Sequence, residues 1–138
     1  MNVKRVRKNL KEKYPDKVII ENKNEEGVTT EIICENEPTS DHPEYSIAIA
    51  VIDSSTLHYH KKVTETYKVL KGTLTVFKTN EEVKLEEGDE LIIKPGEIHS
   101  NLGDETWVEC RSKPGWEIDD YINLEPIIKK YTARGNKK

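Results

Sequence analysis

Four side chains in this sequence have the types and the spacing of a transition-metal site. His58 and His60 stand two residues apart in a β-rich stretch. Side chains so spaced on a strand point to the same side, with Cα atoms roughly 6.6 Å apart. Glu65 follows after a tight turn, and His99 comes just after the turn signal Pro95-Gly96. Three imidazoles and one carboxylate form a ligand set suited to a first-row transition metal.

The first of these stretches resembles the first signature motif of the cupin family. It reads His58-x-His60-x4-Glu65-x6-Gly72 and lacks only the leading Gly of that motif, because Ile52 occupies the place. Both histidines and the glutamate therefore fall at the family's metal-ligand positions.

The second signature motif of the cupins is matched by Gly88, Gly96 and His99 at the family's spacing. It departs in two places, since Lys94 stands where a Pro is expected and Gly103 replaces the closing Asn. The short spacer between the two motifs is similar to that of small single-domain microbial cupins. Together the motifs cover about half of the chain.

The resemblance implies an all-β fold, a small jelly-roll β-barrel, with one divalent transition-metal ion held by His58, His60, Glu65 and His99. This ligand set does not select among Fe, Mn, Zn, Ni and Cu, because intrinsic affinity follows a general order and cellular supply decides the rest. The alternative interpretation is that the histidines are surface residues on an ordinary strand.

Tyr67 is the candidate catalytic residue. On an extended strand it shares the inward side with Glu65, so its hydroxyl is expected to reach the open position of the ion or to hold Glu65. The alternative for Tyr67 is an aromatic that packs across strands, since tyrosine favours strands. Trp107 and Cys110 are interpreted as core residues rather than as a substrate platform and a nucleophile.

These residues predict a metal-dependent enzyme acting on a small organic molecule. With Fe(II) or Mn(II), the resemblance to cupin dioxygenases implies joint binding of substrate and O2, and this chemistry is favoured. With Zn(II) or Ni(II), isomerase or lyase chemistry is expected instead. The alternative function is a non-catalytic ligand-binding or sensor cupin, because a fold alone does not assign a reaction.

The composition of the 138-residue chain limits its other partners. A net charge of −4 argues against nucleic acid as the main partner. No apolar run approaches the roughly 18 residues that a membrane span needs. The N-terminus lacks the apolar segment of a secretory signal, and Cys34 and Cys110 form no disulfide framework. We therefore expect a cytoplasmic protein with a small-molecule ligand and with no nucleic-acid or membrane partner.

The length of the chain predicts a single domain over residues 1–138. Apolar residues at helical steps predict a short helix within residues 1–15. Short β-rich runs separated by Gly, Asn and Asp indicate an all-β barrel or sandwich. The resemblance implies the barrel, at about residues 18–113. A second helical pattern falls at about residues 123–132, and this helix is expected to pack on the outside of the barrel.

The stretch Tyr45 to Ile52 is apolar on both faces, which indicates a strand covered on both sides. In a small barrel one face lines the interior. We expect the other face to meet a second sheet or a second subunit, and this is the argument for a homodimer.

Overall fold

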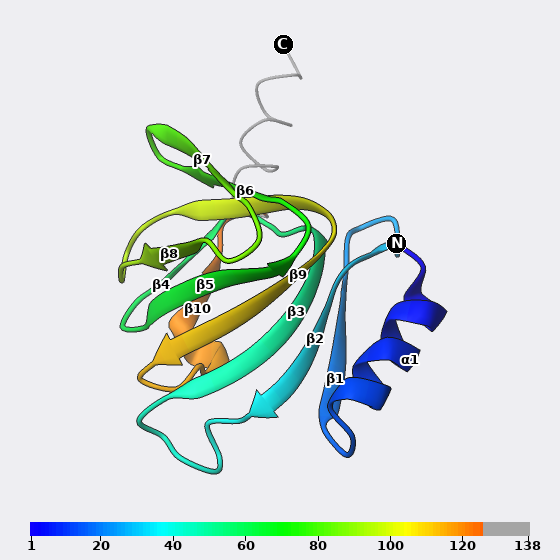
Figure 1. Ribbon diagram of the computed structural model, residues 1–138. Coiled ribbons are helices and arrows are strands. Elements are labelled where there is room, and N and C mark those ends of the chain that lie inside the picture. Colours follow the sequence, from blue (N-terminus) through cyan, green and yellow to red (C-terminus); the bar gives the residue numbers. More distant parts are fainter. Residues whose placement is uncertain (126–138) are drawn as a thin grey trace.

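Most of the chain alternates apolar with polar residues, and this pattern forms strands with one buried face. The computed structural model describes residues 1–125 and shows a curled antiparallel sheet with one helix outside it (Figure 1). Helix α1 spans Val3–Lys13. The strands are β1 (Val18–Lys23), β2 (Thr29–Glu37), β3 (Ser46–Ser54), β4 (His58–His60), β5 (Thr64–Lys71), β6 (Leu74–Lys78), β7 (Glu81–Leu85), β8 (Glu90–Ile93), β9 (His99–Lys113) and β10 (Tyr121–Asn123).

The strands pair in an order that does not follow the chain. The main path of the sheet runs β1-β2-β3-β9-β4-β10, while β5 pairs with β8 and β9, and β6 pairs with β7 and β9. The sheet therefore curls on itself into a half-barrel, with β9 touching four other strands (Figure 1). The predicted all-β jelly-roll fold is confirmed.

A corner in β9 lets this strand serve both halves of the curled sheet. Its first residues pair with β6 and its later residues, from Thr106 on, pair with β3 and β5. The register with β3 shifts between the two halves, and Glu105 there has a positive φ of 45°. Such a β-bulge bends the strand and re-aims its side chains.

The interior of the curled sheet is a hydrophobic core supplied by most of the strands. Its buried members are Ala50, Ile52, Tyr67, Val69, Leu74, Val76, Leu85, Ile93 and Val108. Inward-facing residues stand at alternate positions, as the period of a strand requires. The polar site described below lies at the β4 side of this core.

Helix α1 packs on the outer face of the sheet over β2 and β3, and Figure 1 shows it beside β1. The helix begins after Asn2, whose side chain accepts a hydrogen bond from the Arg5 amide. Its buried residues Val6 and Leu10 join one cluster with Ile49 and Val51 of β3. The expectation of a second sheet or subunit over this face is therefore corrected, because the chain's own helix buries it. The apolar outer face of β3 therefore no longer supports a homodimer, which stays a prediction.

The segment after β9 forms a short helical turn and one further strand. Residues Ile118–Asp120 form a 3-10 turn, and β10 then pairs with β4. Asn123, the first residue of the predicted C-terminal helix, ends this strand, and most of that predicted helix lies outside the described residues. Within residues 1–125, no helix is long and apolar enough to cross a membrane.

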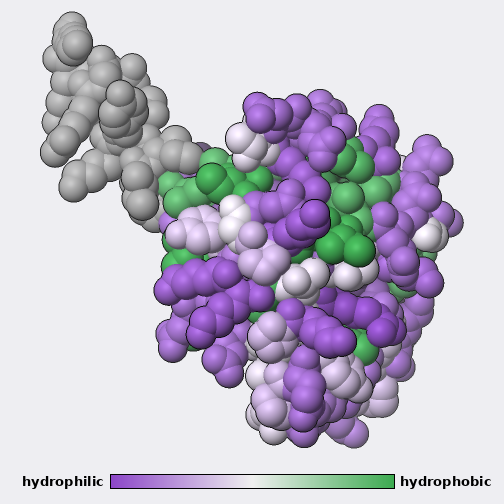
Figure 2. Space-filling view, turned by 90° about the vertical axis from the view of Figure 1, so that its left-hand side faces the viewer, coloured by the Kyte–Doolittle hydropathy of each residue, from purple (hydrophilic) through white to green (hydrophobic). Residues whose placement is uncertain are grey.

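The face of the molecule in Figure 2 is mainly hydrophilic, with hydrophobic residues showing between charged ones. This agrees with a charged content of 35% in the chain.

Candidate metal centre

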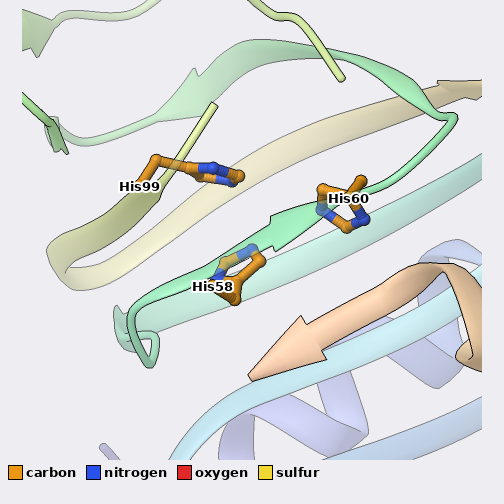
Figure 3. Close-up of side chains that lie close together, drawn as sticks. All are labelled: His58, His60 and His99. Carbon is orange, nitrogen blue, oxygen red and sulfur yellow. The ribbon is translucent and has the colours of Figure 1, made fainter. Parts of the chain in front are cut away.

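Three histidines from two strands converge inside the curled sheet (Figure 3). His58 and His60 lie on the short strand β4 and point to the same side, as their spacing predicts. His99 opens β9 and is the direct register partner of His58. One ligand nitrogen from each ring lies within 4.8 Å of the other two, so the three side chains are positioned to bind a metal ion.

Backbone carbonyl groups fix how two of these rings are presented. His58 Nδ1 lies 2.6 Å from the Thr56 carbonyl oxygen, and His99 Nδ1 lies 2.9 Å from that of Glu97. A carbonyl oxygen only accepts, so Nδ1 carries the proton in both rings and Nε2 keeps its lone pair. This tautomer is the one needed for metal binding through Nε2.

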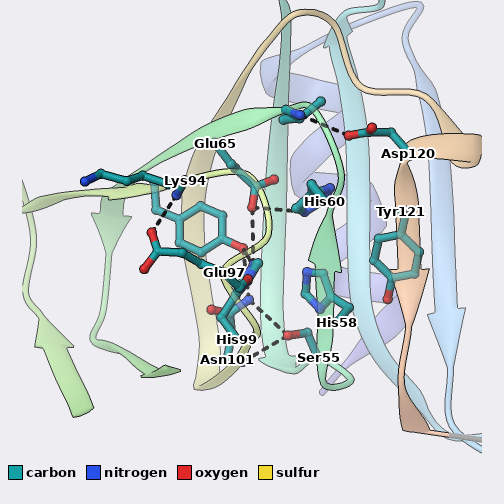
Figure 4. Close-up of polar contacts among 12 residues, drawn as sticks. Ser55, His58, His60, Glu65, Lys94, Glu97, His99, Asn101, Asp120 and Tyr121 are labelled. Atoms are coloured by element: carbon teal, nitrogen blue, oxygen red, sulfur yellow. Dashed lines mark hydrogen bonds and ion pairs between the residues drawn. The ribbon is translucent and has the colours of Figure 1, made fainter. Parts of the chain in front are cut away.

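The imidazole of His60 and one carboxylate oxygen of Glu65 are left without hydrogen bonds. Both ring nitrogens of His60 and Oε1 of Glu65 are buried and have no hydrogen-bond partner. Oε1 lies 3.6 Å from Nε2 of His60 and 3.7 Å from Nε2 of His99, distances too long for good hydrogen bonds (Figure 4). The structure thus gathers the three histidines and places Glu65 beside two of them, with the role of Glu65 as a fourth ligand still a prediction.

The electrostatics suit a cation. Burial, together with the nearby His99, lowers the pKa of His58 to about 4 and keeps this imidazole neutral at pH 7. Burial works to raise the pKa of Glu65, but contacts with His60 and His99 outweigh it and hold this pKa well below its usual range. A neutral imidazole and an ionised carboxylate are the protonation states that metal ligands need.

Tyr67 of β5 points into this centre, on the same side as Glu65. Its Oη lies 3.3 Å from Nε2 of His99 and accepts a hydrogen bond of 3.2 Å from Nδ2 of Asn101. Asn101 Nδ2 also donates to Oγ of Ser55 (Figure 4). Burial and the charge of Glu65 raise the pKa of Tyr67 well above its usual value, so the phenol stays protonated. Its catalytic role stays a prediction.

Trp107 and Cys110 lie on opposite sides of β9. Trp107 packs in the outer cluster beneath α1, where Nζ of Lys13 stands 5.2 Å from the ring centroid. Cys110 packs against the interior core, and burial raises the pKa of its thiol well above the usual value. A thiol held protonated is a poor nucleophile, which agrees with the interpretation of Cys110 as a core residue.

Two residues near the centre have no counterpart in the sequence motifs. Glu31 of β2 faces the interior, because its register partner Ile52 and its alternate neighbour Ile33 belong to the interior core. Tyr121 of β10 is the register partner of His60, and its ring contacts His58. Alternation in β2 indicates that Glu31 and Ile33 share a side, but nothing local indicates that this side faces the histidines.

The centre is nearly closed to solvent. The exposed fractions are 5% for His58, 2% for His60, 7% for Glu65 and 0% for His99. Two shallow hollows among the described residues lie elsewhere, one over α1 and one beside Lys78 and Gly96. The arrangement therefore suits a buried ion with restricted access.

Fold and site together define a curled β-sheet protein with three histidines positioned for a metal ion. Residues 47–108 match the family model described as a cupin domain. This match confirms the family that the two motifs predict for this stretch of the chain. Among curated proteins, none matches the chain.

Several solved structures share the fold. The nucleoside dehydratase Pac13 from Streptomyces superposes with a TM-score of 0.68 at 12% identity, covering 80% of this chain and 86% of that chain. Oxalate decarboxylase from Bacillus subtilis gives a TM-score of 0.67 at 17% identity, covering 80% of this chain and 31% of that chain. KdgF from Halomonas sp. gives 0.57 at 19% identity, covering 66% and 84%. At these identities the likeness shows the fold alone.

Proposed function

We propose that this cupin is a metal-dependent enzyme that acts on a small organic molecule. One observation carries the proposal, namely that both ring nitrogens of His60 and Oε1 of Glu65 are buried without hydrogen-bond partners beside two further imidazoles. A buried polar atom left unpaired costs on the order of 1–3 kcal/mol. A divalent cation in this centre would bind one ring nitrogen of His60 together with Oε1 of Glu65 and the inward nitrogens of His58 and His99, so the residues present fit such an ion.

In this proposal His58, His60, His99 and Glu65 hold the ion. The donor set accepts Fe, Mn, Zn, Ni or Cu and does not choose among them. The bound ion supplies Lewis-acid polarisation of a substrate oxygen and, if it is Fe or Mn, redox chemistry with O2.

The chain's own residues orient the site and handle a proton. The carbonyl groups of Thr56 and Glu97 keep His58 and His99 in the tautomer that turns Nε2 inward. Because Asn101 donates to the Tyr67 oxygen, the Tyr67 proton is free to point toward the centre. We assign to Tyr67 the donation of this hydrogen bond to a substrate oxygen, with Asn101 and Ser55 holding the phenol in place.

Two reaction classes fit these residues. Dioxygenase-type chemistry follows from a redox-active ion in a closed, partly apolar site. Lyase chemistry is supported by the shared fold with a nucleoside dehydratase and with a decarboxylase, since both of those activities eliminate a small molecule. A non-catalytic ligand-binding role is the remaining alternative, and the near-complete burial of the histidines is the observation in its favour.

Metal content tests the site. Inductively coupled plasma mass spectrometry of the purified protein is expected to find one divalent ion per chain, and His60→Ala is expected to lose most of it. His42→Ala is the matched control, because His42 binds the Tyr45 carbonyl and Glu37 and lies outside the histidine cluster. Equal metal in wild type and His60→Ala would overturn the proposed site.

Turnover tests the enzyme. Oxygen consumption by the Fe(II)- or Mn(II)-loaded protein would be followed with diketones, thiols and phenols. A parallel anaerobic series with the Zn(II)- or Ni(II)-loaded protein would be followed by NMR for elimination from hydroxy acids and nucleosides. We expect turnover in one series and a loss of about 10²-fold in Tyr67→Phe at unchanged metal content. No turnover in either series would favour the ligand-binding alternative instead.

A further inference from the structure

Tyr121 lies beside His58 and His60, on the neighbouring strand β10 and on the same side of the sheet (Figure 4). Its ring centroid is 4.8 Å from that of His58, with the two planes inclined by 30°, and 5.8 Å from that of His60. No other aromatic side chain approaches these two imidazoles from the β10 side within residues 1–125. The tyrosine therefore flanks the two histidines at the edge of the sheet.

The hydroxyl of Tyr121 and the imidazole of His58 bind the same residue, Thr56. Tyr121 Oη is hydrogen-bonded to Oγ1 of Thr56 at 2.8 Å. The carbonyl oxygen of the same threonine accepts the Nδ1 proton of His58 at 2.6 Å. Thr56 thus contacts both rings. Its backbone carbonyl binds the imidazole of His58, and its side-chain hydroxyl binds the Tyr121 ring that packs on this imidazole.

The segment that carries Tyr121 is fastened to the strand of the two histidines. The Asp120 carboxylate accepts the amide protons of Lys62 and Val63, at 2.8 and 3.0 Å, and the Asp120 carbonyl accepts that of Lys61. At the other end the Leu124 amide donates to the Leu57 carbonyl. Tyr121 is therefore held on both sides along the chain, and its ring position is defined relative to His58.

We propose that Tyr121 is a positioning residue for His58 and that strand β10, at the edge of the curled sheet, thereby completes the metal centre. The inference rests on the proposed metal-binding function. An imidazole can ligate an ion well only if its ring plane is fixed, and partners beyond the direct ligands supply this orientation. Here the fixing group comes from a segment that contributes no ligand itself.

The test compares Zn²⁺ affinity, measured by competition with a chromophoric chelator, in wild type and in three variants. Tyr121→Phe keeps the ring and removes the hydroxyl, and Thr56→Val removes the partner hydroxyl while leaving the carbonyl in place. Each is expected to raise the Kd about three- to tenfold, and Tyr121→Ala about 10- to 100-fold. The double variant Thr56→Val/Tyr121→Phe should bind no more weakly than either single variant, because both remove one and the same hydrogen bond.

Two further measurements separate positioning from general destabilisation. Tyr59→Phe is the matched control, since Tyr59 stands on β4 between the two histidines and points to the opposite side. The visible absorption of the Co²⁺-loaded protein reports ligand geometry directly and is expected to change in Tyr121→Phe and Thr56→Val but not in Tyr59→Phe.

The outcomes are distinguishable. If wild type binds neither Zn²⁺ nor Co²⁺, the proposed function fails and the inference falls with it. If wild type binds and the affinity and absorption of the Tyr121 and Thr56 variants match it within twofold, the proposed function stands and the inference alone is overturned.

Discussion

Glu31 is a partly buried carboxyl group on the inner side of β2. Asn22 Nδ2 donates to its Oε1 at 2.9 Å. Burial raises the pKa of Glu31 to about 7, which Asn22 partly opposes and the charge of Glu65 reinforces. A proton is therefore held on Glu31 in the folded chain at pH values where the unfolded chain has lost it.

The sign of the resulting pH dependence follows from linkage. Between about pH 4.5 and pH 7 the folded state binds more protons at Glu31 than the unfolded state, so this group lowers stability as the pH rises through that window. We expect Glu31→Gln to remove that fall and to be more stable than wild type at pH 8, by on the order of 1–3 kcal/mol. Near pH 4 the two proteins should agree.

Urea unfolding from pH 4 to pH 8 would measure this effect. Glu82→Gln, at an exposed position of β7, is the control and should follow the wild-type profile. A Glu31→Gln profile that also follows wild type would show that Glu31 is not buried in the folded state.

At the residue scale, spacing predicted which histidines meet. His58, His60 and His99 each fall in a motif, and short-range alternation fixed the inward direction of Tyr67. The sequence did not predict that Glu31 and Tyr121 lie near the centre, because their positions depend on the pairing of β2 with β3 and of β10 with β4. Such pairings join residues far apart in the chain, and no local period encodes them.

The corner of β9 explains one departure from the family motif. A Cβ added at Gly103 would stand 2.6 Å from Oγ1 of Thr106 and 2.7 Å from the carbonyl oxygen of Ile52. Contacts this short force the backbone to shift. The Asn that closes the motif in other cupins therefore does not fit at this position.

We expect Gly103→Asn to destabilise the fold by about 1–3 kcal/mol although it restores the motif residue. Gly27→Asn is the control, since a Cβ at Gly27 meets open space and Asn tolerates a positive φ. Chemical denaturation of both variants gives the comparison, and a stable Gly103→Asn protein would contradict the steric account.

After the corner of β9, the packing of α1 on the outer face of the sheet is a second feature that the sequence predicts only in part. The helical period of its apolar residues predicted the helix, while the apolar outer face of β3 predicted a cover of some kind. Whether this helix is the cover of that strand face depends on how the chain folds back. The structure shows that the helix packs there, which corrects the expectation of a second sheet or subunit.

Leu10→Ala removes a fully buried side chain from this contact and should cost about 2–4 kcal/mol of stability. The metal content should not change, because α1 lies on the outer side of the sheet. Lys8→Ala, at an exposed position of the same helix, is the control and should leave stability within about 0.5 kcal/mol of wild type. Loss of metal in Leu10→Ala at temperatures where it is folded would show coupling between the helix and the centre.

At the scale of the whole molecule, an ion that binds only the folded state raises its stability. At a free metal concentration of 100 Kd the gain is about 2.7 kcal/mol. We expect the unfolding temperature of wild type to rise with added Zn²⁺ and to fall with a chelator, and His60→Ala to show neither change. Differential scanning fluorimetry measures this. An unfolding temperature of wild type that does not respond would contradict the metal centre.

The predicted homodimer belongs to this scale too. Since α1 covers the face of β3 that suggested a partner, a second copy is not needed to bury it. Sedimentation equilibrium decides between monomer and dimer.

The late position of β9 and β10 in the chain has a consequence for synthesis. His99, the register partner of His58, and Tyr121, which packs on it, both come from the last third of the sequence. Chains emerge from the ribosome with the N-terminus first. A nascent chain that already displays His58 and His60 therefore lacks the third histidine of the centre, and the proposed ion capture must wait until His99 has been synthesised.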